Sequence, residues 1–518
     1  MARRIMIQGT GSHVGKSIIV AAFCRIFTQD GYTVAPFKSQ NMALNSYVTA
    51  EGLEIGRAQA FQAFAARKEP TVEMNPILLK PTSDVGAQVI VRGKPVGNMT
   101  AKDYLEYKPK ARGIIKDCFE RLDRENEIVV IEGAGSPAEV NLRENDIVNM
   151  GLAKLLDAPV LLLSDIDKGG VFAWIVGTLE LLEADEKELV KGILINKFRG
   201  DLEILKSGLE FLEKRVNKPV LGVIPYFHDI KIQEEDSVSL SDKKGPARVA
   251  GAGGEKEVVT IEVIQLPRIS NFTDFDALEA ERDVSLRYVG SGEKIGEPDV
   301  IILPGSKNTV SDLLYLKKEG YASEIQEKAR SGQCFVFGIC GGYQMLCNAI
   351  IDPEGVESPL RETEGLGLLP ATTIFESHER KMTNQVRAIA NLEFYNGEIE
   401  GYEIHMGRTY FSNGNVKGAF MVIERSGEEI IEEDCGAVQG TVIGTYIHGI
   451  FDNDAFRRAF LDHVRARKGV LPLHISEYNG DEGKDTRRID WNREYNKLAT
   501  LVRSHVDMTK IYEILNGI

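Results

Sequence analysis

The stretch RIMIQGTGSHVGKS, residues 4–17, predicts the fold of the first part of the chain. The short apolar run Arg4–Gln8 is typical of a buried strand, and a glycine-rich loop follows it as far as Lys16. The next segment has the apolar spacing of a helix. Backbone N–H groups of such a loop can surround phosphate oxygens, and the N-terminus of the helix adds the positive end of its dipole. A strand, a glycine-rich loop and a helix in this order therefore predict a nucleotide-binding domain.

This loop supplies most of the candidate residues for binding ATP: Thr10, Gly11, Gly15, Lys16 and Ser17. We expect the lysine to reach the terminal phosphates and the serine hydroxyl to ligate Mg²⁺. The loop is one residue longer than the usual pattern, because five residues separate its first glycine from the Gly-Lys pair. This longer form resembles the loop of the dethiobiotin synthetase and cobyrinate amidase group.

Short β-branched runs alternate with longer amphipathic segments through the first 230 or so residues. Further strands are expected at Thr33–Phe37, Ile128–Glu132, Pro159–Ser164, Gly192–Asn196 and Pro219–Ile224. Nearly continuous apolar strands separated by helices are typical of a mostly parallel sheet that helices cover on both faces. We place this α/β domain at residues 1–232.

Polar residues at the ends of these strands are further candidates for the site, since open α/β sheets bind ligands at the carboxyl ends of their strands. Glu132 is a candidate second ligand of Mg²⁺, although it could be an ordinary acid in a turn. Asp165 and Lys168 are candidates for binding substrate, and the alternative is a solvated turn that opens a helix. Asn196 is a candidate for contacting adenine, because Arg199 stands where P-loop GTPases have their guanine-reading aspartate.

The polar, glycine-rich stretch at residues 233–257 predicts a linker. A second α/β pattern then begins, with strands expected at Val258–Gln265, Asp299–Pro304 and Cys334–Ile339. We assign residues 258–518 to this second domain, including a helical tail over Arg488–Ile518.

A cysteine on a sharp turn is the main chemical feature of the second domain. Cys340 lies between an apolar strand and a predicted helix, with glycines beside it, as in a nucleophile elbow. His448 follows another predicted strand and is suited to activate the thiol. Gly341 and Gly305 are the candidates for an oxyanion hole. The alternative for a lone cysteine is a place in the core.

Composition limits the class of protein. The chain has 518 residues, 43% of them apolar and 27% charged, which is usual for a folded protein with more than one domain. Its formal charge of -15 argues against nucleic acid and anionic lipid as partners. Six scattered cysteines and the lack of a long apolar run point away from disulfides, zinc and a membrane span, so we expect a cytoplasmic protein.

The elbow and the distant histidine are similar to those of the triad-type glutamine amidotransferases, and their combination with the N-terminal loop resembles the cobyric acid synthase family. The segments that carry this resemblance are Lys38–Ser46, Glu132–Glu139, Asp165–Phe172, Arg268–Phe275 and Gly401–Gly407. The resemblance implies an ATP- and Mg²⁺-dependent ligase that takes ammonia from glutamine. It also implies a corrinoid substrate, adenosylcobyrinic acid a,c-diamide, amidated at its b, d, e and g carboxylates to give cobyric acid in cobalamin biosynthesis.

The resemblance adds Lys38 and Asn41 to the candidates for binding this polyanionic substrate, and Lys80 and Arg92 are further basic candidates. Triad-type amidotransferases usually carry a glutamate two residues after the histidine, where this chain has Ile450. Glu403 is a candidate substitute, with packing or a salt bridge as its alternative.

Two other functions remain open. The related cobyrinic acid a,c-diamide synthase family shares both domain types and differs in the carboxylates it amidates. A regulatory P-loop switch of the partitioning-ATPase kind resembles the loop, but such switches carry a lysine where this chain has Gly11, and a switch does not explain a cysteine–histidine pair.

Overall fold

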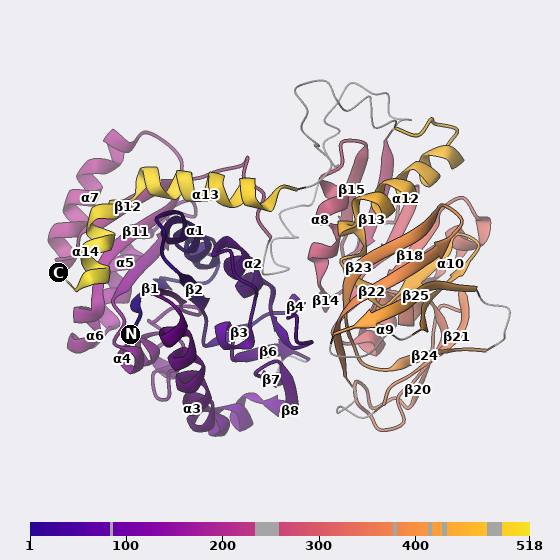
Figure 1. Cartoon of the computed structure of the whole chain (residues 1–518), viewed down its shortest axis with the longest axis horizontal. Coiled ribbons are helices and arrows are strands. Elements are labelled where there is room, and N and C mark those ends of the chain that lie inside the picture. The colour runs from indigo at the N-terminus through magenta and orange to yellow at the C-terminus, as the bar shows by residue number, and fades with distance from the viewer. Residues whose placement is uncertain are drawn as a thin grey trace.

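A computed structural model of the chain describes residues 1–82, 86–233, 258–376, 381–412, 417–426, 432–473 and 489–517. Residues 1–233, which we call the first part, and residues 258–473, the second part, lie side by side (Figure 1). The expected linker falls outside the described residues apart from Gln233, so the expected domain boundaries at residues 232 and 258 remain predictions. No helix among the described residues combines the length and apolar composition that a membrane span requires.

The core of the first part is a six-stranded sheet whose paired strands all run parallel. Across the sheet the strands are β12 (Val220–Pro225), β11 (Val190–Phe198), β10 (Val160–Asp165), β1 (Arg3–Gly9), β9 (Ile128–Glu132) and β2 (Val34–Phe37). The predicted parallel α/β fold is confirmed. Since β1 lies between β10 and β9, the loops that follow these three strands meet at one edge of the sheet.

Alternation along the strands explains why helices cover both faces. Ile5 and Ile7 of β1 join one hydrophobic cluster, whereas Met6 joins another on the opposite face. Successive strand side chains point to opposite faces, so a fully apolar strand needs cover on both. The helices of this part are α1 (Lys16–Gln29), α2 (Arg57–Ala65), α3 (Ala101–Glu125), α4 (Met150–Leu156), α5 (Val171–Leu181), α6 (Ala184–Leu189) and α7 (Leu202–Val216).

Two small sheets in the first part were not predicted from the sequence. They lie between the six-stranded sheet and the second part (Figure 1). One contains β3 (Gln40–Met42), β6 (Ile77–Pro81), β7 (Gly86–Val91) and β8 (Lys94–Thr100), and the other pairs β4 (Ser46–Val48) with β5 (Glu54–Gly56). Lys80 of β6 lines a hollow together with Cys340 of the second part.

A ten-stranded mixed sheet forms the core of the second part. Its parallel half contains β15 (Val284–Val289), β13 (Val259–Ile264), β16 (Val300–Leu303), β18 (Phe335–Ile339) and β27 (Val442–Thr445). The antiparallel half continues with β26 (Glu433–Gln439), β25 (Lys417–Arg425), β22 (Met382–Leu392), β23 (Tyr395–His405) and β28 (Ile447–His448). The expected strands of the second α/β pattern are thus confirmed, while the antiparallel half was not anticipated.

Helices and two smaller sheets complete the second part. The helices are α8 (Asp276–Glu279), α9 (Thr309–Glu319), α10 (Tyr321–Ser331), α11 (Gly341–Leu346) and α12 (Asp454–Arg467). One small sheet pairs β14 (Ile269–Ser270) with β17 (Gly305–Ser306), and the other contains β19 (Cys347–Ile351), β20 (Glu362–Glu364), β21 (Leu369–Ile374) and β24 (Arg408–Phe411).

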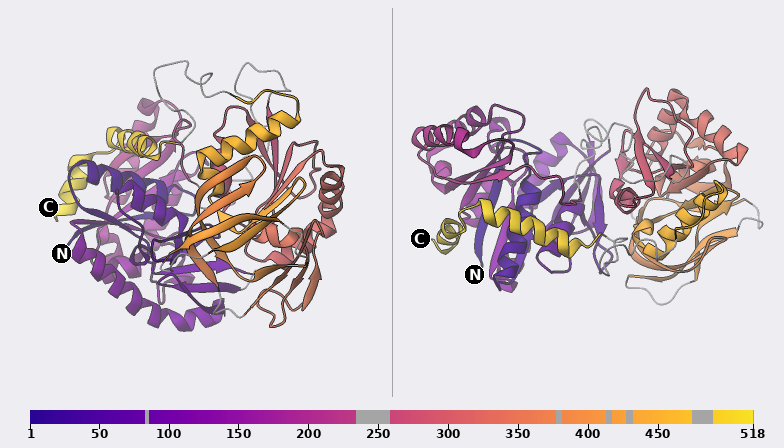
Figure 2. Two further views of the ribbon diagram at one scale, coloured as in Figure 1. Left: turned by 45° about the vertical axis from the view of Figure 1, so that its right-hand side comes forward. Right: turned by 90° about the horizontal axis from the view of Figure 1, so that it is seen from above.

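The C-terminal helices return to the first part. Helices α13 (Trp491–His505) and α14 (Met508–Asn516) lie against it in both views of Figure 2, and both chain ends lie there. Tyr495, Leu498 and Val502 share a hydrophobic cluster with Phe23 and Phe27 of α1. The tail is helical, as expected, but it differs from the expected grouping with the second domain. Its amphipathic helices bury their apolar faces against α1, and their spacing alone does not specify that partner.

Candidate active sites

The phosphate loop connects the end of β1 to the start of α1, as predicted. Gly15 has a φ of 99°, a left-handed conformation that favours glycine. A Cβ atom at this position would stand 2.3 Å from the side-chain nitrogen of Asn196. The ammonium of Lys16 donates to the carbonyl oxygens of Gly11 at 2.9 Å and Gly135 at 3.1 Å. The lysine head group is therefore held over the loop, where phosphates bind in P-loop proteins.

The carboxylate of Glu132 lies at the centre of the polar groups next to this loop. Its Oε1 accepts hydrogen bonds from the Ser17 hydroxyl and from the Lys38 ammonium, each at 2.8 Å. Lys38 and Glu132 are both buried, and such a pair persists only when both charges have partners. The two side chains predicted to ligate a metal, on α1 and β9, are thus in direct contact.

These residues fit a magnesium ion that shares its coordination with phosphates and water. Mg²⁺ in nucleotide sites usually takes one or two protein oxygens, and Ser17 and Glu132 supply that number. No cluster of three His, Cys, Asp or Glu side chains suited to a metal occurs among the described residues, so an all-protein cage is not found there. Lys38 competes for the same carboxylate oxygen and would have to share Glu132 with the ion.

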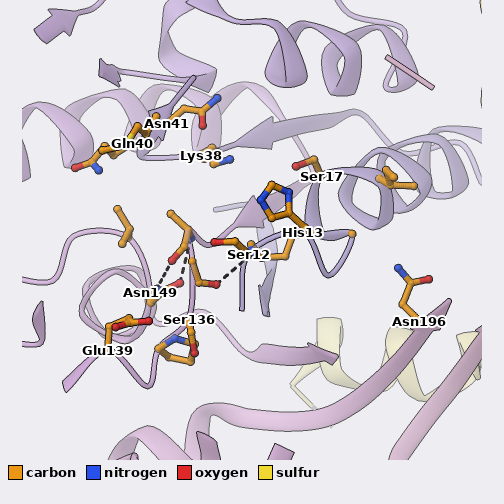
Figure 3. A pocket seen from close by; sticks show the side chains of 18 of the residues that line it. Ser12, His13, Ser17, Lys38, Gln40, Asn41, Ser136, Glu139, Asn149 and Asn196 are labelled. Atoms are coloured by element: carbon orange, nitrogen blue, oxygen red, sulfur yellow. Dashed lines mark hydrogen bonds between the residues drawn. The ribbon is translucent and has the colours of Figure 1, made fainter. Parts of the chain in front are cut away.

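A cavity of about 850 Å³ opens beside the loop (Figure 3). In that view Asn196 lies on one side of Ser12 and His13, while Lys38, Gln40 and Asn41 lie on the other. The cavity brings together many of the predicted site residues. Those that line it are Gly15, Lys16, Ser17, Lys38, Asn41, Lys168 and Asn196.

Other predicted residues lie just outside this cavity. Thr10 and Gly11 line a neighbouring hollow together with Asp165. Both carboxylate oxygens of Asp165 have partners in the chain: the Lys197 ammonium at 2.8 Å and the backbone N–H of Asp167 at 2.8 Å. These contacts fix the turn after β10, and a substrate contact for Asp165 stays a prediction.

Two of the basic candidates do not line the cavity. Arg92 faces Asp117 on the surface of the first part, and Lys80 extends toward the cysteine of the second part. A contact of either side chain with the corrinoid stays a prediction. Lys80 lies on β6 and Arg92 lies in the turn between β7 and β8, both in the small sheet that was not predicted from the sequence.

Asn196 has one free hydrogen-bonding group. Its side-chain nitrogen donates to the carbonyl oxygen of Val14 at 2.9 Å. Its Oδ1 is buried and has no hydrogen-bond partner in the described part of the chain. An unpaired buried acceptor costs about 1–3 kcal/mol, which a ligand with an N–H donor would offset. The exocyclic amino group of adenine is such a donor, whereas guanine presents a carbonyl oxygen at the equivalent position.

The cysteine of the second part occupies the predicted elbow between β18 and α11. Cys340 has a φ of 53°, which is strained for a residue that is not glycine and is often found at functional sites. A Cβ atom on Gly342 would stand 1.9 Å from the carbonyl oxygen of Leu303, so the turn after the cysteine leaves no room for a side chain. The backbone thus places the cysteine at the N-terminus of α11.

His448 and Asp274 complete a triad with this cysteine. Asp274 lies in the 3-10 helix Phe272–Phe275, and its Oδ2 is 2.7 Å from Nδ1 of His448. Its other oxygen accepts the backbone N–H of Gly449 at 3.0 Å. Burial opposes a charge on the imidazole, but the Asp274 carboxylate outweighs it and, with a hydrogen bond to the Cys340 thiol, raises the pKa of His448 to about 10. The histidine is thus favoured as the cation that a thiolate needs.

Glu403 is not the third member of the triad. Its Oε2 accepts from Arg425 at 2.9 Å, and its other oxygen contacts the thiol of Cys435. In the register of β23 and β28, Glu403 stands opposite Ile447 rather than His448. Glu403 therefore forms a salt bridge, which was the alternative to a role in the triad. Asp274 lies within a segment that resembled the family, but it is 174 residues from its histidine and no spacing rule connects them.

The two predicted oxyanion residues lie beside the cysteine and histidine. A Cβ atom on Gly305 would be 3.1 Å from Cε1 of His448, and one on Gly341 would be 2.9 Å from the backbone nitrogen of Ser306. Gly305 therefore approaches His448 closely, and Gly341, which directly follows Cys340, packs against the strand that contains Gly305. Their role in holding an oxyanion stays a prediction.

A bridge from the first part reaches the triad. The backbone N–H of Ser46 donates to Oδ1 of Asn271 at 2.8 Å, and the N–H of Phe272 donates to the side-chain oxygen of Asn45 at 3.3 Å. The amide nitrogen of Asn271 is in turn 3.4 Å from Nε2 of His448. Lys38 and Asn41 line the nucleotide cavity, and a few residues later the same segment is hydrogen-bonded to Asn271 beside the histidine of the second part.

Known proteins match both halves of this arrangement. Residues 5–240 match the CobQ/CobB/MinD/ParA nucleotide binding domain, and residues 260–456 match the CobB/CobQ-like glutamine amidotransferase domain. The cobyric acid synthase of Alkaliphilus metalliredigens (strain QYMF) is 51% identical over an alignment of 521 positions, gaps included, that covers 99% of this chain and 100% of the relative. That of Thermoanaerobacter sp. (strain X514) is 52% identical over an alignment of 524 positions that covers 99% of each chain.

Proposed function

This chain belongs to the cobyric acid synthase family, and from that premise we propose how its two sites divide the work. The protein is a glutamine-hydrolysing ligase that uses ATP and amidates a corrinoid in cobalamin biosynthesis. We propose that the substrate is adenosylcobyrinic acid a,c-diamide and that its b, d, e and g carboxylates are amidated. The observation that carries the proposal is the presence in one chain of a P-loop site and a Cys340–His448–Asp274 triad, joined through Asn271.

In the first part, ATP would phosphorylate a corrinoid carboxylate. The carboxylate oxygen attacks the terminal phosphorus and the bond from this phosphorus to the bridging oxygen breaks. The products are an acyl phosphate and ADP, which departs. Lys16 offsets the charge that develops on the transferred group, and Asn196 holds the adenine through its unpaired oxygen. Ser17 and Glu132 would hold Mg²⁺, which supplies charge neutralisation for the phosphates. Lys38 and Lys168 are suited to orient the anionic substrate in the cavity.

In the second part, glutamine would supply ammonia. The Cys340 thiolate attacks the side-chain amide carbon, and the protonated His448 gives its proton to the departing nitrogen. Water then hydrolyses the thioester to glutamate. Asp274 orients the imidazole and stabilises its cation, while the backbones of Gly305 and Gly341 are suited to hold the oxyanion. The ammonia attacks the acyl phosphate, and phosphate leaves as the amide forms.

Mass spectrometry of the products tests this proposal. The enzyme is incubated with ATP, Mg²⁺ and glutamine, and with either adenosylcobyrinic acid a,c-diamide or cobyrinic acid. We expect successive products from the first corrinoid, each with one more hydroxyl replaced by an amino group, up to four. Two amidations of cobyrinic acid itself, with none of the a,c-diamide, would instead identify an a,c-diamide synthase.

The division between the sites has its own test. Cys340→Ala should remove glutamine-dependent amidation while high concentrations of ammonia still support it, since the P-loop site is unchanged. Wild-type turnover with glutamine in this variant would overturn the role of the cysteine. Equal loss with glutamine and ammonia in a folded protein would show that the two sites cannot act separately.

A further inference from the structure

The hollow beside Cys340 has charged walls that the mechanism above does not use. Lys307 and Glu357 of the second part line it close to the thiol, and Lys80 of the first part reaches in from the other side. A second hollow of about 270 Å³ also contains Lys307 and Glu357, and its opposite wall is the small sheet of the first part, at Gln88. A molecule that enters between the two parts therefore meets these two charged groups next to the cysteine.

Some of these charges are already satisfied. Glu54 forms ion pairs with Lys80, at 2.7 Å, and with Lys381, which lies across the junction in the second part. Lys80 also donates to the Ser46 hydroxyl at 2.9 Å. One carboxylate between two ammonium groups leaves an excess of positive charge on this wall.

Lys307 and Glu357 are less completely paired. Oε2 of Glu357 accepts the backbone N–H of Thr309 at 2.8 Å, and in the described part of the chain its Oε1 has no hydrogen-bond donor. Within the same residues the Lys307 ammonium has no acceptor at hydrogen-bond distance, although Glu357 lies near enough to favour its charge. The pocket thus presents one acceptor and one donor of opposite charge, side by side, near a nucleophile.

The surroundings make both groups costly to keep charged. Burial, and then the neighbouring Lys381 and Lys80, lower the pKa of Lys307 to about 8. Burial raises the pKa of Glu357 to about 7, against the effect of Lys307. A ligand that brings an anion to the first and a cation to the second would remove this cost.

A free α-amino acid is such a ligand, because its ammonium and carboxylate are attached to the same carbon. We propose that Glu357 binds the α-ammonium and Lys307 the α-carboxylate of glutamine, so that the side-chain amide extends to Cys340. This assignment rests on the proposed hydrolysis of glutamine at Cys340. It makes the site select an α-amino acid rather than any primary amide of the same length.

Two thiol reagents separate recognition of the head group from reactivity of the cysteine. Iodoacetamide requires only the Cys340 thiolate, whereas the glutamine analogue 6-diazo-5-oxo-L-norleucine also carries the α-ammonium and α-carboxylate. Labelling of Cys340 is followed by peptide mass spectrometry in the full-length wild type, Glu357→Gln and Lys307→Met. The exposed Glu354→Gln on the same loop and the exposed Lys318→Met on α9 are matched controls.

A hydrogen bond to a charged group contributes about 1.5–3 kcal/mol, so labelling by the analogue should slow roughly 10- to 150-fold in each pocket variant. The iodoacetamide rate and ammonia-dependent amidation should stay within about twofold, and the controls should match the wild type. Equal slowing with both reagents, or no slowing with the analogue, would overturn the assignment. Failure of the analogue to label wild-type Cys340 would contradict the proposed glutamine hydrolysis instead.

Discussion

Asp274→Asn tests what the carboxylate contributes to His448 while the histidine itself is kept. The change replaces one oxygen by nitrogen and keeps the shape of the side chain. In the wild type the Asp274 carboxylate raises the pKa of His448 to about 10. Without that charge the buried imidazole should titrate at or below its ordinary value of about 6.5. The variant should therefore lose the imidazolium, and with it the stabilised thiolate, at working pH.

The size of the loss follows from the two pKa values. At about pH 8 a histidine with a pKa near 10 is almost wholly protonated, whereas one near 6.5 is protonated to roughly 3%, a difference of about 30-fold. A wrongly held tautomer adds to this, since the same change in a serine triad costs about 10⁴ in rate. We expect glutamine hydrolysis to fall between about 30-fold and 10⁴-fold.

Glutamate release measures this effect, with ammonia-dependent amidation as the check on folding and Glu279→Gln on α8 as a control. Stability gives a second measurement. A raised pKa in the folded state stabilises the protein fully below the unfolded pKa of about 6.5, and that contribution is lost as the pH rises through about 10. This decline in unfolding free energy should be absent in Asp274→Asn. Glutaminase activity within threefold of wild type, with an unchanged pH profile, would refute the triad.

Three further predictions concern the nucleotide site and the helix that packs on α1. Lys16→Ala should abolish amidation with glutamine and with ammonia alike, because both routes need the activated carboxylate; full ammonia-dependent turnover would contradict this. Glu132→Gln should lower turnover and raise the Mg²⁺ concentration that turnover requires, as measured by Mg²⁺ titration. An unchanged Mg²⁺ requirement would show that Glu132 has only a structural role. Leu498→Ala should lower the free energy of unfolding by about 2–5 kcal/mol in urea titrations, whereas the exposed Arg493→Ala should change it little. An effect of Leu498→Ala as small as that of Arg493→Ala would contradict the packing of α13 on α1.

The parts of the fold that the sequence predicted depend on local signals. The apolar run through Ile5 and Ile7, the glycine-rich loop and Lys16 specify a strand, a turn and a helix within a few residues of one another. The same holds for Cys340, whose elbow needs only its neighbouring glycines and the strand before it. Such features follow from backbone geometry over a short span, so they can be read without knowledge of the rest of the fold.

The parts that were missed depend on contacts between distant segments. Asp274 meets His448 across 174 residues, and an aspartate in a short polar segment has no local mark of that role. The small sheet is a second example. Arg92 and Gly93 both have positive φ and form the two-residue turn between β7 and β8, but Arg-Gly is not one of the pairs, such as Asn-Gly or Asp-Gly, that mark such a turn in a sequence.

The return of α13 and α14 to the first part has a consequence during protein synthesis. The strands around the phosphate loop are made before the second part, whereas Tyr495 and Tyr512, which pack on Phe61 and Phe27, emerge only after it. Until then the apolar side of α1 lacks its cover while the entire second part is being made. The nucleotide-binding core is thus completed only after the second part has been made, and the nascent chain must keep that surface from aggregating in the interval.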